Sequence, residues 1–155
     1  MPALKQSWLN LVIDHRYRAQ AITIPATWYI GLFNVIPTRS ASGTEISTGA
    51  GYTGYARQSI ACSLANWSGT QGAGTTTASS GTNDYITNNV DITFSASLAA
   101  AWSGLVGFGL FDAVSGGNHR EWGEIVDSGG NAITVSRAIG EPVIFEAGQL
   151  RLYIR

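Results

Sequence analysis

The sequence has few charged residues and almost no net charge. Lys, Arg, Asp and Glu make up 12% of the 155 residues, about half the usual share, so Ser, Thr, Gly and Asn must cover much of the surface. Nine basic residues and ten acidic ones leave a formal charge of −1, and Lys5 is the single lysine. This balance excludes a positively charged surface for nucleic acid. A weakly charged surface is common in proteins that work inside assemblies.

Cysteine and long apolar runs are also scarce. Cys62 is the single cysteine, which excludes an intrachain disulfide and a cysteine metal site, and we expect it to be a small core residue. No run reaches the roughly 18 apolar residues of a membrane span. Asp14, His15 and Arg16 interrupt the first apolar segment, so no signal peptide is expected. We expect a protein that stays in the cytoplasm where it is made, or leaves it by lysis.

Catalytic signatures are missing as well. The two histidines are His15, on a predicted helix, and His119, which we expect to be solvated in a turn. No G-x-S-x-G motif occurs. Glu121 and Glu124 are three positions apart on a predicted strand and therefore point to opposite faces, unlike the paired carboxylates of glycosidases. The sequence predicts no catalytic, cofactor-binding or metal-binding residues, and a protein that is not an enzyme.

A glycine-rich hairpin is the strongest local pattern present. Two runs typical of strands, residues 105–113 and 120–126, flank Gly116, Gly117 and Asn118, which accept the positive φ of a tight turn. In the first run, Gly107 and Gly109 share a face and leave a slot that a large ring can fill.

The ring expected in that slot is an indole. Trp28, Trp102 and Trp122 are candidates, and Trp122 on the partner strand is preferred because diagonal neighbours lie within reach. The fragment GLFDA at residues 109–113 also partly repeats GLFNV at residues 31–35.

A helix is predicted over residues 3–18. Leu4, Trp8, Leu11, Val12 and His15 form one stripe at a period of 3.6 residues. This stripe is typical of an amphipathic helix that covers a sheet. The alternative is an arm that docks on a neighbouring subunit with Trp8 as its anchor.

The remaining chain predicts short strands separated by glycine-rich turns. Further strands are expected at residues 27–36, 60–64, 88–94, 132–136, 143–145 and 149–155. About eight short strands at close spacing indicate a mainly β fold, namely a single antiparallel β-sandwich (jelly-roll-like) with one N-terminal α-helix. We expect one domain over residues 1–155. Residues 68–84 form a flexible Ser/Thr/Gly loop, which is either a mobile surface loop or an arm that orders against a partner.

Arg57 is the most informative charged residue. It follows Tyr52 and Tyr55 and precedes a strand. The favoured interpretation is a structural arginine that caps loop carbonyls or pairs with Glu45. The alternative is a subunit contact, because Arg and Tyr are enriched at interfaces. The residues predicted as a possible interface are Trp8, Tyr52, Tyr55, Arg57 and Trp67.

Several segments together resemble a family of small tailed-bacteriophage virion proteins. They are an N-terminal helix, PATWYIGLF at 25–33, GYARQ at 54–58, ITF at 92–94, WSGLVGFGLFDA at 102–113, GGN at 116–118 and the terminal FEAGQLRLYI. Members of this family are often labelled tail fibre proteins, and small capsid-decoration (cement) proteins provide a broader architectural comparison. The resemblance covers nearly the whole chain in consistent order, and it carries over no catalytic residue.

The resemblance implies a non-enzymatic structural component of the virion, assembled in the host bacterial cytoplasm. It is expected to act through protein–protein contacts, as a capsid decoration or cement protein or as a tail-associated, fibre-type protein. Its expected partners are other copies of itself, as a homo-oligomer, and major capsid or tail proteins, with no cofactor, nucleic acid or membrane. The alternative is a host-surface glycan-binding module of the tail, for which Trp67 is the best candidate. The copy number per virion separates a head lattice from a tail part.

Overall fold

The computed structural model describes residues 3–47, 52–80, 85–97 and 100–153. The fold is mainly β with one helix, as predicted. The elements in chain order are β1 (Ala3–Leu4), α1 (Gln6–Arg18), β2 (Thr27–Val35), β3 (Thr44–Glu45), β4 (Gln58–Ala61), β5 (Tyr85–Thr87), β6 (Ile92–Phe94), β7 (Trp102–Leu105), β8 (Gly107–Phe111), β9 (His119–Glu124), β10 (Val135–Arg137), β11 (Val143–Phe145) and β12 (Arg151–Tyr153).

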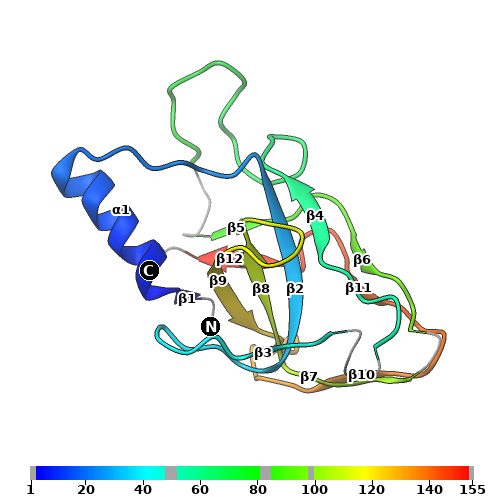
Figure 1. Ribbon diagram of the computed structural model, residues 1–155. Helices are drawn as coiled ribbons and strands as arrows, with labels where there is room; N and C mark the ends of the chain where they lie inside the picture. Colours follow the sequence, from blue (N-terminus) through cyan, green and yellow to red (C-terminus); the bar gives the residue numbers. More distant parts are fainter. Residues whose placement is uncertain (1–2, 48–51, 81–84, 98–99, 154–155) are drawn as a thin grey trace.

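One six-stranded sheet organises the molecule. Its order is β1-β9-β8-β2-β3, and β4 also pairs with β2. Three two-stranded sheets, β10-β7, β11-β6 and β12-β5, complete the fold, and every pair is antiparallel. Figure 1 shows β2 and β8 crossing the centre, with α1 to one side and the small sheets around them.

A shared apolar core joins the large sheet to the small ones. Ile30 of β2 and Leu110 of β8 belong to the same buried cluster as Phe94 of β6 and Leu152 of β12. The arrangement is therefore sandwich-like, with strands packed on both sides of one core, which agrees with the predicted class. Its assignment as a jelly roll stays a prediction.

The central strand β2 has a divided outer edge. β4 pairs with Thr27 to Ile30, and β3 pairs with Phe33 and Val35. On this outer edge, opposite the β8 side, no strand among the described residues pairs with the interval at Gly31 and Leu32. Backbone groups in that interval need another partner, because an unpaired buried N–H costs free energy.

The glycine slot exists, but its predicted occupant is wrong. A Cβ on Gly109 would lie 2.5 Å from the Phe33 ring and 2.7 Å from Nε2 of His119. Trp122 is paired directly opposite Gly109, yet the rings over the glycine come from β2 and from the start of β9. The reason is that β2, on the other side of β8, carries Phe33 two residues beyond Gly31, which pairs with Gly109.

The helix begins later than predicted. Leu4 lies in β1, where its backbone pairs with Glu121, and α1 starts at Gln6. The main chain of Lys5 is extended, at φ −64° and ψ 145°, and its N–H donates to the Arg120 carbonyl. Edge pairing with β9 therefore overrides the helical stripe at its first position.

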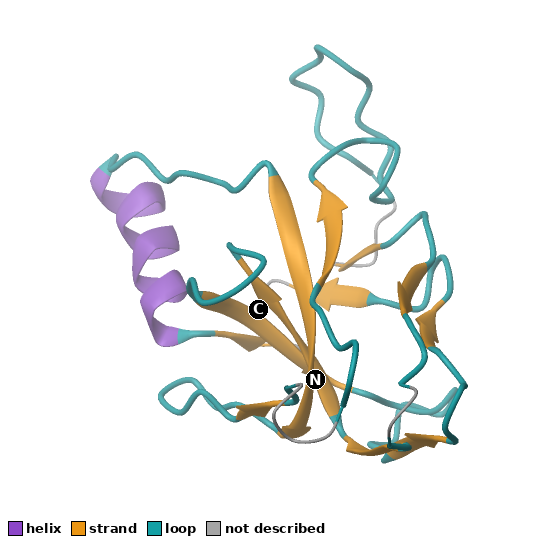
Figure 2. Ribbon diagram, turned by 45° about the vertical axis from the view of Figure 1, so that its right-hand side comes forward, coloured by secondary structure: helices purple, strands orange, loops and turns teal. Residues whose placement is uncertain are grey.

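The inward face of α1 is narrower than the predicted stripe. Trp8 is buried, Val12 is half-buried, and Leu11 (39% exposed) and His15 lie at the surface. The helix ends at Arg18, and Ala19, the residue that caps it, has a left-handed φ of 54°. Figure 2 shows α1 beside the sheet rather than lying flat across it. In the described part of the chain, no helix has the length and apolar character needed to cross a bilayer.

Several predicted strands are shorter than expected, including those at 60–64 and 88–94. The strand predicted at 60–64 is β4, which ends at Ala61, so Cys62 and Leu64 lie at the surface rather than in the core. The strand predicted at 88–94 is reduced to β6, and Val90 is 40% exposed. Asn88 interrupts that run because its side chain is buried and bonds to the backbone of Leu150 and Glu146.

The Ser/Thr/Gly segment forms an exposed loop where the structure describes it. Residues 69–80 are exposed and project from the body, as the long loop at the top of Figure 1. At its base the Ser79 hydroxyl accepts the N–H groups of Thr70 and Gln71 at 3.0 and 3.1 Å. Residues 81–84 of the predicted loop lie outside the described residues, and the loop's flexibility stays a prediction.

Candidate functional site

A largely buried ion pair with Glu45 holds Arg57 in place, as the favoured interpretation predicted. Its Nε and Nη2 donate to the two carboxylate oxygens of Glu45 at 2.8 and 2.7 Å. Nη1 donates to the carbonyls of Ala113 and Gly116, both at 2.8 Å. The guanidinium lies 3.4 Å from the centre of the Phe111 ring. Arg57 therefore ties β3 and β4 to the hairpin turn after β8.

Tyr55 completes this cluster by filling the gap beside β2. Its hydroxyl donates to Glu45 at 2.7 Å and accepts the Leu32 N–H at 3.0 Å. Burial and the neighbouring Glu45 carboxylate raise the pKa of Tyr55 far above its usual value. A Cβ on Gly31 would lie 2.7 Å from the Glu45 carboxylate, so glycine is needed there for the carboxylate to approach.

The other predicted interface residues also have partners within the chain. Trp8 is 5% exposed and packs edge-on against Trp28 at 6.0 Å. Tyr52 stacks on Trp102 at 5.6 Å, and its hydroxyl donates to the Ser103 carbonyl. Trp67 is 9% exposed, and its Nε1 donates to the Ala61 carbonyl at 3.2 Å. A role for these residues at a subunit interface stays a prediction.

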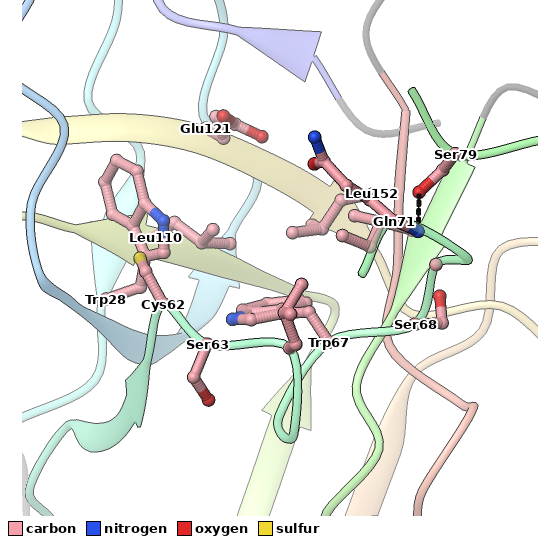
Figure 3. A pocket seen from close by; sticks show the side chains of 13 residues that line it. Trp28, Cys62, Ser63, Trp67, Ser68, Gln71, Ser79, Leu110, Glu121 and Leu152 are labelled. Atoms are coloured by element: carbon pink, nitrogen blue, oxygen red, sulfur yellow. Dashed lines mark hydrogen bonds between the residues drawn. The ribbon is translucent and has the colours of Figure 1, made fainter. Parts of the chain in front are cut away.

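A cleft of about 470 Å³ lies between the main sheet and the β5-β12 pair. Figure 3 shows Glu121 and Trp67 on opposite sides of it, with Trp28, Leu110 and Leu152 between them. The residues that line the cleft are Trp28, Cys62, Ser63, Leu64, Trp67, Ser68, Gly69, Gln71, Ser79, Ile86, Leu110, Glu121 and Leu152. Its volume falls in the range of small-molecule sites, about 300–1,000 Å³.

Glu121 gives this mainly apolar cleft one acidic group. The residue pairs with Leu110 on β8 and with Leu4 on β1, so its side chain shares the core face of the sheet. Burial raises the pKa of the Glu121 carboxyl to about 7, and a hydrogen bond from the Trp8 side chain partly offsets this shift. The carboxyl therefore exchanges its proton near neutral pH.

The sequence did not predict this cleft. From the sequence, Glu121 and Glu124 were expected to point to opposite faces of one strand and so not to form an acid/base pair. The register does place the two on opposite faces of β9. Trp67 was predicted as the best candidate for glycan binding, and it is nearly buried and forms one wall of the cleft. One signal for the cleft was available in the sequence, namely the position of Glu121. This acidic residue lies opposite Leu110 rather than Gly109, so its side chain points to the same face of the sheet as Leu110.

His119 is a packing residue, which corrects the expectation of a solvated side chain. It is sandwiched against Phe111 at 4.9 Å and Phe33 at 5.1 Å, and its Nε2 lies 2.7 Å from the Glu121 carbonyl. Burial lowers the pKa of His119 to about 4, so the imidazole is neutral at physiological pH. A neutral ring donates from Nε2 to the carbonyl and packs among the phenyl rings at low cost.

No group of three or more His, Cys, Asp or Glu side chains suited to a metal ion occurs among the described residues.

The model of the podophage GP4 fiber I protein gp80 family matches residues 3–152. The chain belongs to this family of phage fibre proteins. The predicted resemblance to tail-fibre-labelled virion proteins is thereby confirmed. No curated protein matches the chain.

Membership of the fibre family fixes the broad role of the protein. It supports a structural, tail-associated role and implies a virion component in contact with other virion proteins. The family is structural, which agrees in general terms with the expectation of a protein that is not an enzyme.

Proposed function

We propose that the protein is a tail-associated, fibre-type building block that acts through protein–protein contacts and catalyses no reaction. The observation that carries the proposal is the family match over residues 3–152. The Arg57–Glu45 cluster supports it, because a guanidinium held by four hydrogen bonds stiffens the body without exposing a reactive group. A capsid decoration or cement role is the less favoured form, because the matched family is named for a fibre.

A homo-oligomer is part of this proposal. Apolar side chains are exposed on α1 and just after it, namely Leu11 (39%), Ile13 (43%), Tyr17 (73%) and Ile24 (54%). These exposed side chains, of which Ile13 and Tyr17 are four residues apart and share one face of α1, support contact with a second copy of the chain, since exposed apolar groups concentrate at interfaces. Sedimentation of the wild type and of a Tyr17→Glu/Ile13→Glu variant tests this. A wild type that stays monomeric at high concentration contradicts it.

The location on the virion is tested by counting and labelling. Quantitative mass spectrometry of purified virions gives the copy number, and gold labelling of a tagged chain gives its position. A small number of copies at the tail supports the proposal. Hundreds of copies spread over the head indicate decoration instead, and absence from the virion rules out a structural role.

A host-surface glycan site is the second candidate. It is supported by Trp67 and Trp28 in the wall of the cleft and by the polar side chains of Ser68 and Gln71 on its rim, because sugars pack on aromatic rings and bond to amides and hydroxyls. Binding of the purified protein to host lipopolysaccharide, compared with a Trp67→Ala variant, tests it.

A further inference from the structure

We propose that the cleft between the main sheet and the β5-β12 pair binds an organic cation, a positively charged alkylammonium or guanidinium group on an apolar stem, with its head at Glu121 and its stem against Trp28 and Trp67. This inference goes beyond membership of a fibre family and does not depend on where the protein sits in the virion.

The apolar walls provide for the stem of such a ligand. Leu110 and Leu152 are almost fully buried and belong to the core, and Trp28 and Trp67 are 8% and 9% exposed. Contact with these side chains removes apolar surface of the ligand from water at about 25 cal/mol per Å². The cleft is open to solvent at Leu64, which is 56% exposed, so a ligand can enter without unfolding.

Glu121 sets the sign of the charge that the cleft accepts. The other polar lining groups are the thiol of Cys62 and the neutral side chains of serines and Gln71. Among the described lining residues, none is basic. A carboxylate taken out of water is costly unless a cation pairs with it. The hydrogen bond that Glu121 receives from the Trp8 side chain comes from a neutral group, so it supplies no opposite charge.

The basic groups next to Glu121 along the chain are already engaged elsewhere. Arg120 pairs with Asp112 at 2.7 Å, on the hairpin side of β9. Lys5 donates its ammonium to the carbonyls of Thr38 and Ala41 at 2.8 and 2.6 Å. Neither of these two groups is therefore free to pair with Glu121.

The two tryptophans favour a cation over a neutral sugar. Indole is the best aromatic partner for a cation, and such contacts strengthen when water is excluded. A carboxylate facing indole rings is the combination by which proteins hold ammonium groups. The hydroxyl of Ser79, on the rim where a sugar needs polar partners, already accepts two backbone N–H groups. The glycan therefore becomes an alternative outcome of the test.

Ligand binding must be linked to pH. Burial raises the pKa of the Glu121 carboxyl to about 7. A cation that binds beside it therefore displaces its proton. Because fewer carboxyls carry that proton at higher pH, the affinity of the cleft for a cation rises from pH 5.5 to pH 8. The groups that face Glu121 from the neighbouring elements are neutral or already paired. Trp8 on α1 has no charge, and burial raises the pKa of the Cys62 thiol after β4. Arg120 pairs with Asp112, and the Lys5 ammonium donates to the carbonyls of Thr38 and Ala41.

The test compares benzylammonium with benzyl alcohol, which has the same shape without the charge. Titration calorimetry and the indole N–H signals of Trp28 and Trp67 report binding. We expect benzylammonium to bind about tenfold more tightly at pH 8 than at pH 5.5, and about tenfold more tightly than benzyl alcohol at pH 8, which corresponds to about 1.4 kcal/mol.

Glu121→Gln should remove this preference, and Glu124→Gln, on the opposite face of the same strand, should leave it unchanged. A second measurement needs no variant. In the wild type at pH 6.5, binding should release a proton, which is seen as a dependence of the binding heat on the ionisation enthalpy of the buffer. Equal affinity for the alcohol and the ammonium, no proton release, or no binding of benzylammonium at millimolar concentration overturns the proposal.

The source of the cation is distinguished by a second set of probes. N-acetyl-lysine amide and N-acetyl-arginine amide represent a side chain of a partner protein, and benzylammonium represents a free amine. Tighter binding of the amino-acid amides assigns the site to a partner's side chain, and tighter binding of benzylammonium assigns it to a small molecule. If neutral monosaccharides shift the same indole signals equally in the wild type and in Glu121→Gln, the proposal of a cation site is overturned and a glycan site is favoured.

Discussion

Gly31 and Gly109 pair across β2 and β8, and each lies beneath the phenyl ring that the other strand carries two residues later. A Cβ on Gly31 would meet Phe111 at 2.9 Å, and one on Gly109 would meet Phe33 at 2.5 Å. The two rings stack at 6.0 Å between centres. The repeated GLF fragments thus form a local two-fold arrangement in which each strand accommodates the other's ring.

Replacing Gly109 with Val is expected to lower the free energy of unfolding by about 1–3 kcal/mol, because the branched side chain enters the space of Phe33 and His119. Urea unfolding measures the loss. Gly72→Val in the exposed loop is the matched control, since a Cβ there meets Thr75 at an ordinary 3.5 Å. Equal stability of the two variants would show that the slot tolerates a side chain.

Removing the Arg57 guanidinium is expected to destabilise far more than removing an exposed one. Its side chain is 9% exposed and that of Glu45 is 22% exposed, whereas Arg18 and Asp14 are 71% and 36% exposed. Arg57→Met leaves the partly buried Glu45 carboxylate bonded to the Tyr55 hydroxyl but without a counter-charge, at about 3–5 kcal/mol. Arg18→Met should cost about 0–1 kcal/mol. Thermal unfolding of both variants under the same conditions measures the two losses of stability. Similar losses for Arg57→Met and Arg18→Met would contradict the stabilising role of the Arg57 network.

The stability of the protein should depend on two titrations of opposite sign. The pKa of His119 falls from 6.5 to about 4 on folding, so the unfolded chain binds more protons between these values and stability rises with pH. The pKa of Glu121 rises from 4.5 to about 7, so the folded chain binds more protons there and stability falls as pH rises. The two effects oppose each other from about pH 4.5 to 6.5.

Single variants should separate the two titrations. Glu121→Gln is expected to unfold at increasing denaturant concentration as pH rises from 4.5 to 6.5, because the contribution of His119 is then unopposed. His119→Phe is expected to show the reverse trend, a decline up to pH 7. Urea midpoints across this range measure both. A Glu121→Gln profile parallel to that of the wild type would contradict the raised pKa.

Shortening the exposed loop should leave stability nearly unchanged. Residues 72–77 are exposed and lie beyond the base that Ser79 closes, so replacing them with Gly-Gly should alter the free energy of unfolding by about 0.5 kcal/mol or less. The matched change, Gly-Gly in place of residues 114–117, disturbs the turn whose Gly116 carbonyl binds Arg57 and should destabilise clearly. A large loss for the first variant would show that the loop packs on the body.

The sequence predicted the elements whose patterns are local. β2 extends over Thr27–Val35 within the predicted residues 27–36, and β11 matches residues 143–145, because apolar and β-branched runs between prolines and glycines have few alternatives. The sequence also predicted a structural Arg57 that caps loop carbonyls or pairs with Glu45, and the side chain does both.

Features that depend on distant partners were not predicted. The start of α1 was wrong because Leu4 and Lys5 bond to β9, more than a hundred residues away in the chain. The ring over Gly109 was assigned to Trp122 because the hairpin was visible in the sequence and the β2-β8 pairing was not. The cleft needs Trp28, Trp67 and Glu121 from three separate parts of the chain, and no spacing rule brings these together.

The position of β2 in the sheet has a consequence for synthesis of the chain. This strand leaves the ribosome early, but β8, which pairs with its residues Tyr29 to Phe33 along one edge, comes at residues 107–111. Contacts of such high sequence separation form late. A nascent chain that ends before β8 leaves Ile30 and Leu32 without a neighbour on that edge and is prone to aggregate. Because the β2-β8 pairing forms late, the yield of folded protein is expected to depend on translation speed and on chaperones. A chain stalled before residue 107 should be the main species that chaperones retain.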